Sequence, residues 1–110
     1  MTERSESRPV IDVELERVRR DIDDVDQEIL ELLSKRARHI VTVVGLKALA
    51  QRALRDPGRE EQILERLAAR NQSPFPPESI RGVFRAIIDA SLDLEERLIR
   101  AARRIDGAAS

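Results

Sequence analysis

The sequence predicts an all-α chain of three helices, the first of which is very long. No proline lies between Pro9 and Pro57, and apolar residues recur there at intervals of three and four. No segment shows the alternation of apolar and polar residues that is typical of strands. At 110 residues, with 41% hydrophobic and 37% charged residues, the chain is expected to form one modest core with long solvated helix faces.

The first helix is expected to follow a flexible tail at residues 1–10 and to end near Leu49. Its apolar stripe consists of Leu15, Val18, Ile22, Val25, Ile29, Leu32, Arg36, Ile40, Val43 and Lys47. A helix of about 38 residues is ~57 Å long, whereas a compact chain of this size has a radius of gyration near ~13 Å. Unless the helix kinks near Gly45, a second copy must cover the stripe, so we expect an intertwined homodimer.

The second helix is predicted to begin at Asp56-Pro57 and to end near Arg70. Aspartate is a favoured N-cap residue, and proline is favoured at the first helical position because its missing N–H has no intrahelical partner there. A turn-rich break, residues 71–76, follows this helix.

Pro77 is expected to open the third helix. The helical domain then spans residues 11–104, and residues 105–110 are expected to form a flexible tail.

Composition excludes several kinds of chemistry. The chain has no cysteine and a single histidine, which argues against thiolate chemistry, a metal site or a histidine-based triad. A net charge of -1 with interspersed signs gives no broad surface for nucleic acid or an anionic membrane. No apolar run has membrane-spanning length, and the N-terminus lacks the apolar core of a signal peptide. We therefore expect a cytoplasmic protein without cofactor or metal, and no nucleic-acid or membrane partner.

Four polar residues occupy positions on the apolar stripes. Arg36 and Lys47 lie on the stripe of the first helix, and Ser91 and Glu95 are four residues apart on the third. Each alone has an ordinary explanation, such as a snorkelling side chain or a structural ion pair. Two buried cations are costly without a partner, so the four together favour a site for a small anionic ligand.

Distances along the first helix restrict which cations can share one pocket. Arg36 and Lys47 are ~16 Å apart along the axis and on nearly the same azimuth, so their long side chains can converge on one ligand. Arg19 lies ~25 Å from Arg36, too far to serve the same pocket in a straight helix. It could instead reach the pocket of a partner chain.

These positions make the chain resemble the all-helical chorismate mutases over roughly residues 12–99. The family's arginine in the first helix falls at Arg19 in VRRDIDDVD, its second arginine at Arg36 in LLSKR, and its lysine at Lys47 in VGLKA. The remaining positions are Asp56, Arg59 and Glu60 in RDPGREEQIL, and Ser91 and Glu95 in IIDASLDLEE. At the position of Glu95 many members of the family carry glutamine, and some others carry glutamate as this chain does.

The resemblance implies a three-helix chain in an intertwined dimer that converts chorismate to prephenate by an intramolecular Claisen rearrangement. It implies that Arg36 and the opposite subunit's Arg19 clamp the two carboxylates of the dianion, and that Lys47 contacts a carboxylate and the ether oxygen. Asp56 and Glu60 would hold the ring hydroxyl. Further substrate-binding residues would be Arg59 and Ser91 at the carboxylate region and Val43, Ile87 and Ile88 around the ring. A protonated Glu95 could donate to the ether oxygen.

Other interpretations remain open on the sequence alone. A mutase acting on 4-amino-4-deoxychorismate would fit because Asp56 and Glu60 can also accept an ammonium group. An isochorismate-pyruvate lyase and a non-catalytic helical dimerisation module are further alternatives. Arg52 and Arg55 border the predicted pocket, and ordinary loop charge explains them as well as a role in steering the dianion.

Overall fold

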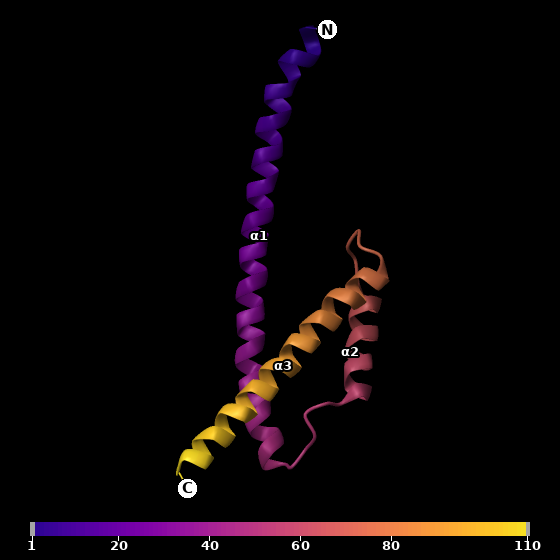
Figure 1. The fold of residues 1–110 in the computed structure, drawn as a ribbon. Coiled ribbons are helices and arrows are strands. Elements are labelled where there is room, and N and C mark those ends of the chain that lie inside the picture. The colour runs from indigo at the N-terminus through magenta and orange to yellow at the C-terminus, as the bar shows by residue number, and fades with distance from the viewer. Residues whose placement is uncertain (1, 110) are drawn as a thin grey trace. The chain divides into compact units, whose positions relative to one another are not determined.

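The computed structural model describes residues 2–109, which form helices α1 (Thr2–Leu49), α2 (Pro57–Arg70) and α3 (Pro77–Ala109) (Figure 1). Within this range no strand occurs, so the predicted all-α class with a very long first helix is confirmed. The chain separates into two compact units, one up to Arg36 and one from Ala37 onward. None of the helices described is long and apolar enough to cross a membrane.

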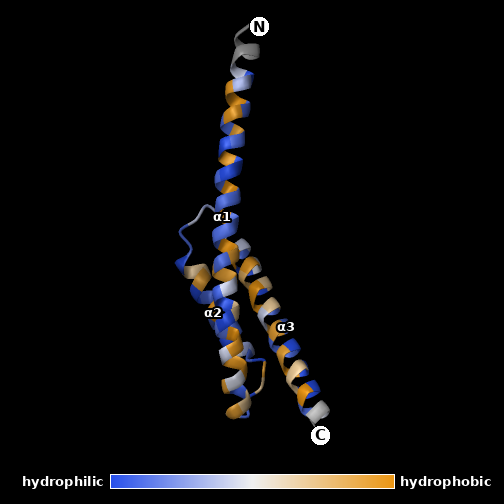
Figure 2. Cartoon of the chain, turned by 90° about the vertical axis from the view of Figure 1, so that its left-hand side faces the viewer, coloured by the Kyte–Doolittle hydropathy of each residue, from blue (hydrophilic) through white to orange (hydrophobic). Residues whose placement is uncertain are grey.

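In the first unit, the apolar stripe of α1 is largely open to solvent in a single chain. Along this part of the helix, hydrophobic residues recur at intervals between hydrophilic ones (Figure 2). The exposed stripe residues are Leu15 (45%), Val18 (45%), Ile22 (52%), Val25 (50%), Ile29 (48%) and Leu32 (64%). Exposed apolar surface of this extent and regularity is typical of a protein-protein contact face.

Both ends of the helical region lie further out than predicted. Helix α1 begins at Thr2 and contains Pro9, so the helix extends into residues 1–10, where the sequence predicted a flexible tail. Proline has a helical φ, and the hydrogen bond that it removes lies near the start of the helix. Helix α3 continues through Gly107 to Ala109, beyond the predicted end at residue 104, and a single glycine costs only about 1 kcal/mol there. Met1 and Ser110, parts of the two predicted tails, lie outside the described residues.

In the second unit, α2 packs against α3 around a small core. Leu64 on α2 and Ile88 on α3 are each 5% exposed. Two carboxylates are buried as deeply, since Glu60 is 6% and Glu95 3% exposed. A core with as many buried acids as buried apolar side chains is unusual, because burying a charge is costly unless it is paired.

The predicted start of α2 is confirmed. The side chain of Asp56 caps the helix by accepting a hydrogen bond from the Arg59 backbone N–H at 3.1 Å, and Pro57 follows in the first turn. This cap fixes the direction in which the preceding loop enters the helix, and with it the position of Arg55.

Helix α1 passes through Gly45 and ends in a Schellman-type turn. The Arg52 N–H donates to the Lys47 carbonyl at 2.9 Å, and the Gln51 N–H donates to the Ala48 carbonyl at 3.2 Å. Gln51 has a φ of 54°, the left-handed conformation that such a turn requires and that glycine adopts most readily. The turn reverses the chain directly after Lys47.

Replacing Gln51 by glycine is expected to raise the free energy of unfolding by about 1 kcal/mol, because glycine adopts a positive φ without a Cβ clash. Denaturant unfolding at one fixed chain concentration measures the change. Arg52→Gly, one residue later, serves as the matched control and should destabilise the chain through added backbone freedom in the unfolded state. Equal stabilisation by both variants would contradict the assigned turn.

Candidate active site

An ion pair between α1 and α3 lies at the centre of the candidate site. The Lys47 ammonium donates to the Leu54 backbone carbonyl at 2.6 Å and to Oε1 of Glu95 at 3.2 Å. The Lys47 side chain is 24% exposed and the Glu95 side chain 4%. Two residues that stood out on separate apolar stripes thus contact each other.

The second carboxylate oxygen of Glu95 has no partner. Oε2 is buried and makes no hydrogen bond in the single chain. Leaving such a group unsatisfied costs about 1–3 kcal/mol, so native proteins rarely keep one without a reason. A ligand group that meets Oε2 would remove this cost.

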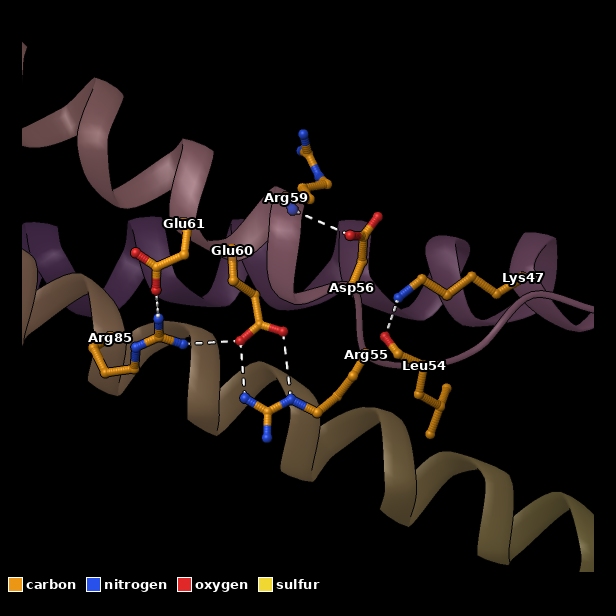
Figure 3. A network of polar contacts seen from close by, with 8 residues as sticks. All are labelled: Lys47, Leu54, Arg55, Asp56, Arg59, Glu60, Glu61 and Arg85. Carbon is orange, nitrogen blue, oxygen red and sulfur yellow. Dashed lines mark hydrogen bonds and ion pairs between the residues drawn. The ribbon is translucent and has the colours of Figure 1, made fainter.

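A second cluster surrounds Glu60 in the first turn of α2 (Figure 3). Arg55 donates from Nη2 to Oε1 at 3.0 Å and from Nε to Oε2 at 3.4 Å. Arg85 on α3 donates from Nη1 to the same Oε1 at 2.8 Å and from Nη2 to Glu61 at 2.9 Å. The hydrogen bond from Arg55, reinforced by that from Arg85, holds the pKa of the Glu60 carboxyl below its ordinary value despite burial.

Three consecutive loop residues join these two clusters. The carbonyl of Leu54 binds the Lys47 ammonium, the side chain of Arg55 binds Glu60, and Asp56 caps α2. The last three residues of the loop are therefore each held by a polar contact. A movement of this loop would disturb Lys47 and Glu60 together.

The other residues predicted for substrate binding lie on the same unit. Ser91 is half-buried one turn before Glu95, and its hydroxyl donates to the Ile87 carbonyl at 2.8 Å. Ile88 is buried, whereas Val43 and Ile87 are half-buried.

Arg59 behaves differently from the acids around it. Its side chain is exposed and extends away from the Glu60 carboxylate, while its backbone N–H is used by the Asp56 cap (Figure 3). The structure therefore brings Asp56 and Glu60 to the start of α2 and gives the Arg59 guanidinium no contact with Glu60.

The two remaining predicted cations, Arg19 and Arg36, belong to the first unit. Arg19 is 61% exposed and pairs at 3.0 Å with Glu16, one turn earlier on the same helix. Arg36 is half-buried at the end of this unit.

Arg85 and Arg55 in the Glu60 cluster do not stand out in the sequence. Arg85 follows Phe84 on α3 and does not interrupt an apolar stripe, so spacing within one helix gives no signal for it. Only the register of α2 against α3 brings Arg85 to Glu60. Arg55 precedes an N-cap aspartate by one residue, which is compatible with ordinary loop charge.

Cavities lie beside these clusters. A cavity of about 330 Å³ is bordered by the basic side chains of Lys47, Arg52, Arg100 and Arg103. A smaller one of about 230 Å³ lies between Leu54, Arg55 and Asp89. Glu60, Ser91 and Glu95 line neither of these two cavities. Neither of these two cavities is therefore lined by the full set of predicted binding residues in a single chain.

Residues 18–96, which include both clusters, match the family model described as chorismate mutase type II. The chain belongs to this family. A solved chorismate mutase (Form II) from Thermus thermophilus is 44% identical, with a TM-score of 0.73, over 76% of this chain and 94% of that one. The type II chorismate mutase fold and the isomerase family predicted from the eight matched positions are confirmed.

Relatives with curated names are larger proteins. A bifunctional chorismate mutase/prephenate dehydratase from Aquifex aeolicus is 35% identical over 77% of this chain, and one from Neisseria gonorrhoeae is 38% identical over 70%. The chain spans only about a quarter of the first relative's length and 21% of the second's. The family is therefore shared, and the dehydratase part of those names concerns the relatives.

Replacing Glu60 by glutamine is expected to destabilise this chorismate mutase-family chain at pH 7. A carboxyl whose native pKa is lowered contributes stability above its unfolded-state pKa and loses it as pH falls through the native value. The deficit of Glu60→Gln should therefore shrink as the pH falls below 4.5, the ordinary value for glutamate. Denaturant unfolding at pH 7 and pH 3 measures it, with the exposed α2 residue Glu65→Gln as the control. A deficit that is the same at both pH values would refute the assigned ion pairs.

Proposed function

We propose that the protein is a chorismate mutase, which isomerises chorismate to prephenate by an intramolecular Claisen rearrangement in aromatic amino-acid biosynthesis. The observation that carries this proposal is the Lys47–Glu95 pair between α1 and α3, with one buried carboxylate oxygen left unpartnered. Membership of the chorismate mutase family supports the same reaction.

The rearrangement needs a flexible dianion held in its compact reactive shape and donors near the ether oxygen. Negative charge grows on that oxygen as the C–O bond breaks, and a donor already in place stabilises it without reorganisation. Lys47 is such a donor, because the Leu54 carbonyl and Glu95 hold its ammonium in position. One of its three hydrogens remains for the substrate.

Glu95 stands beside Lys47 with a free oxygen. As a carboxylate, Oε2 would repel the developing charge, whereas a protonated Oε2 would donate to the ether oxygen. In this proposal the substrate supplies the partner that Oε2 lacks.

The start of α2 holds the other side of the substrate. Asp56 and Glu60 accept the ring hydroxyl, and Ser91 supports the carboxylate region together with the Arg59 guanidinium once its exposed side chain turns inward. Val43, Ile87 and Ile88 form the apolar wall around the ring. Their half-buried or buried positions on α1 and α3 support this role.

The substrate carboxylates are clamped by Arg36 and by Arg19 of a second copy of the chain. Guanidinium groups pair with carboxylates through two parallel hydrogen bonds, which fixes orientation as well as charge. The exposed stripe of the first unit, from Leu15 to Leu32, supports an intertwined homodimer in which the second copy covers it.

Purified protein is expected to form prephenate from chorismate, and Lys47→Ala is expected to lower kcat by about 10²–10³-fold, as loss of an oxyanion donor does. Lys35→Ala, an exposed lysine on the same helix, is the matched control and should retain activity. Arg36→Ala should also lose activity. Full activity in Lys47→Ala would refute the proposed donor.

The same assay separates the alternative functions. Parallel incubations with chorismate, 4-amino-4-deoxychorismate and isochorismate distinguish the two mutases from the lyase, which would release pyruvate. A dimer that turns over none of the three and binds no dicarboxylate transition-state mimic would be a dimerisation module.

A mixture of Arg19→Ala and Lys47→Ala chains, unfolded and refolded together, is expected to regain activity. If Arg19 acts across the dimer, each mixed dimer holds one complete site, and random assortment restores about one quarter of wild-type activity. If Arg19 acts within its own chain, every site is defective. Each variant refolded alone is the control, and sedimentation confirms the dimer. No recovery in mixed dimers would contradict an intersubunit role.

A further inference from the structure

Glu60 is surrounded by more positive charge than its place in the proposed site explains. Arg85 lies 2.8 Å and Arg55 3.0 Å from the same oxygen, Oε1, and Arg55 also reaches Oε2. The Glu60 side chain is 8% exposed, so these contacts are partly shielded from water. One arginine would be enough to compensate the charge of the buried Glu60 carboxylate, but Glu60 has two arginine partners.

The two arginines are held in different ways. Arg85 comes from α3 and is 33% exposed, with Glu61 fixing its other nitrogen at 2.9 Å. Arg55 comes from the loop and is 63% exposed. Arg85 is therefore the less screened charge of the two. Screening by water weakens the effect of Arg55.

The two guanidinium groups affect which substrate group Glu60 can bind. With two donors on Oε1 and one on Oε2, the Glu60 carboxylate has one acceptor site left, on Oε2, for a neutral hydroxyl. An ammonium group at the same place would meet two like charges close by, which is unfavourable at short range. The pair of arginines thus favours a neutral donor over a cationic one.

Accepting the proposed function, we infer that Arg85 is a positioning and specificity-determining residue that selects a hydroxyl over an ammonium group at the Glu60 end of the site. Arg55 assists from the loop. The substrate class is therefore a ring alcohol, and the amino analogue is discriminated against by charge. Specificity here comes from an unfavourable contact with the wrong substrate as well as from a good one with the right substrate.

The test compares kcat/KM for chorismate and 4-amino-4-deoxychorismate at pH 7 in the wild type, Arg85→Met and Arg85→Lys. Arg85→Met removes the charge, and the preference for chorismate should fall by about tenfold or more. Arg85→Lys keeps the charge but loses the forked contact with Glu60 and Glu61. It should lower activity on both substrates while retaining most of the preference.

Arg97→Met is the matched control, because Arg97 is an exposed arginine on α3 paired only locally with Asp93 among the described contacts. It should change neither activity nor preference.

If Arg85→Met fails to fold, the exposed loop variant Arg55→Met gives the same comparison with a smaller expected shift. Equal losses on both substrates in the charge-removing variants would overturn the inference, since a merely structural role predicts that result. A wild type inactive on both substrates would instead overturn the proposed function and the inference with it.

Discussion

The placement of one ammonium group determines most of the candidate site. Lys47 lies in the last turn of α1, where it binds the Leu54 carbonyl of the following loop and the Glu95 carboxylate of α3. The turn at Gln51 is what brings Leu54 back to Lys47. A backbone conformation that is costly for glutamine is thereby coupled to the position of a charged side chain.

Buried charge is a prominent feature of the second unit. Glu60 and Glu95 are buried as deeply as Leu64 and Ile88. Buried ion pairs contribute little net stability, because desolvation offsets the attraction between the charges. Their presence in so small a core is better explained by function than by folding. The unpartnered oxygen of Glu95 likewise points to a ligand.

The two buried acids differ in how fully they are satisfied. Glu60 is bound by two arginines through both of its oxygens, so it is fixed before any substrate arrives. Glu95 is bound through one oxygen only. In the proposed mechanism this difference suits their roles, because Glu60 recognises a group that does not react and Glu95 lies beside the bond that breaks.

The sequence by itself determined the helices and singled out candidate residues for the site, because both depend on local rules. Spacing of apolar residues predicted α1, and Asp56-Pro57 predicted the start of α2. Polar residues on apolar stripes singled out Lys47 and Glu95, which the structure brings into contact. Local rules placed the outer ends of α1 and α3 wrongly, since Pro9 and Gly107 weaken a helix without ending it.

Tertiary structure decided which charges meet. Arg85 is an ordinary surface-type residue in the sequence, and only the register between α2 and α3 brings it to Glu60. The contact of Lys47 with the Leu54 carbonyl likewise depends on the turn after α1, and a backbone acceptor leaves no trace in residue identity. Pairing between separate helices depends on their packing, which the periodicity of each helix alone does not specify.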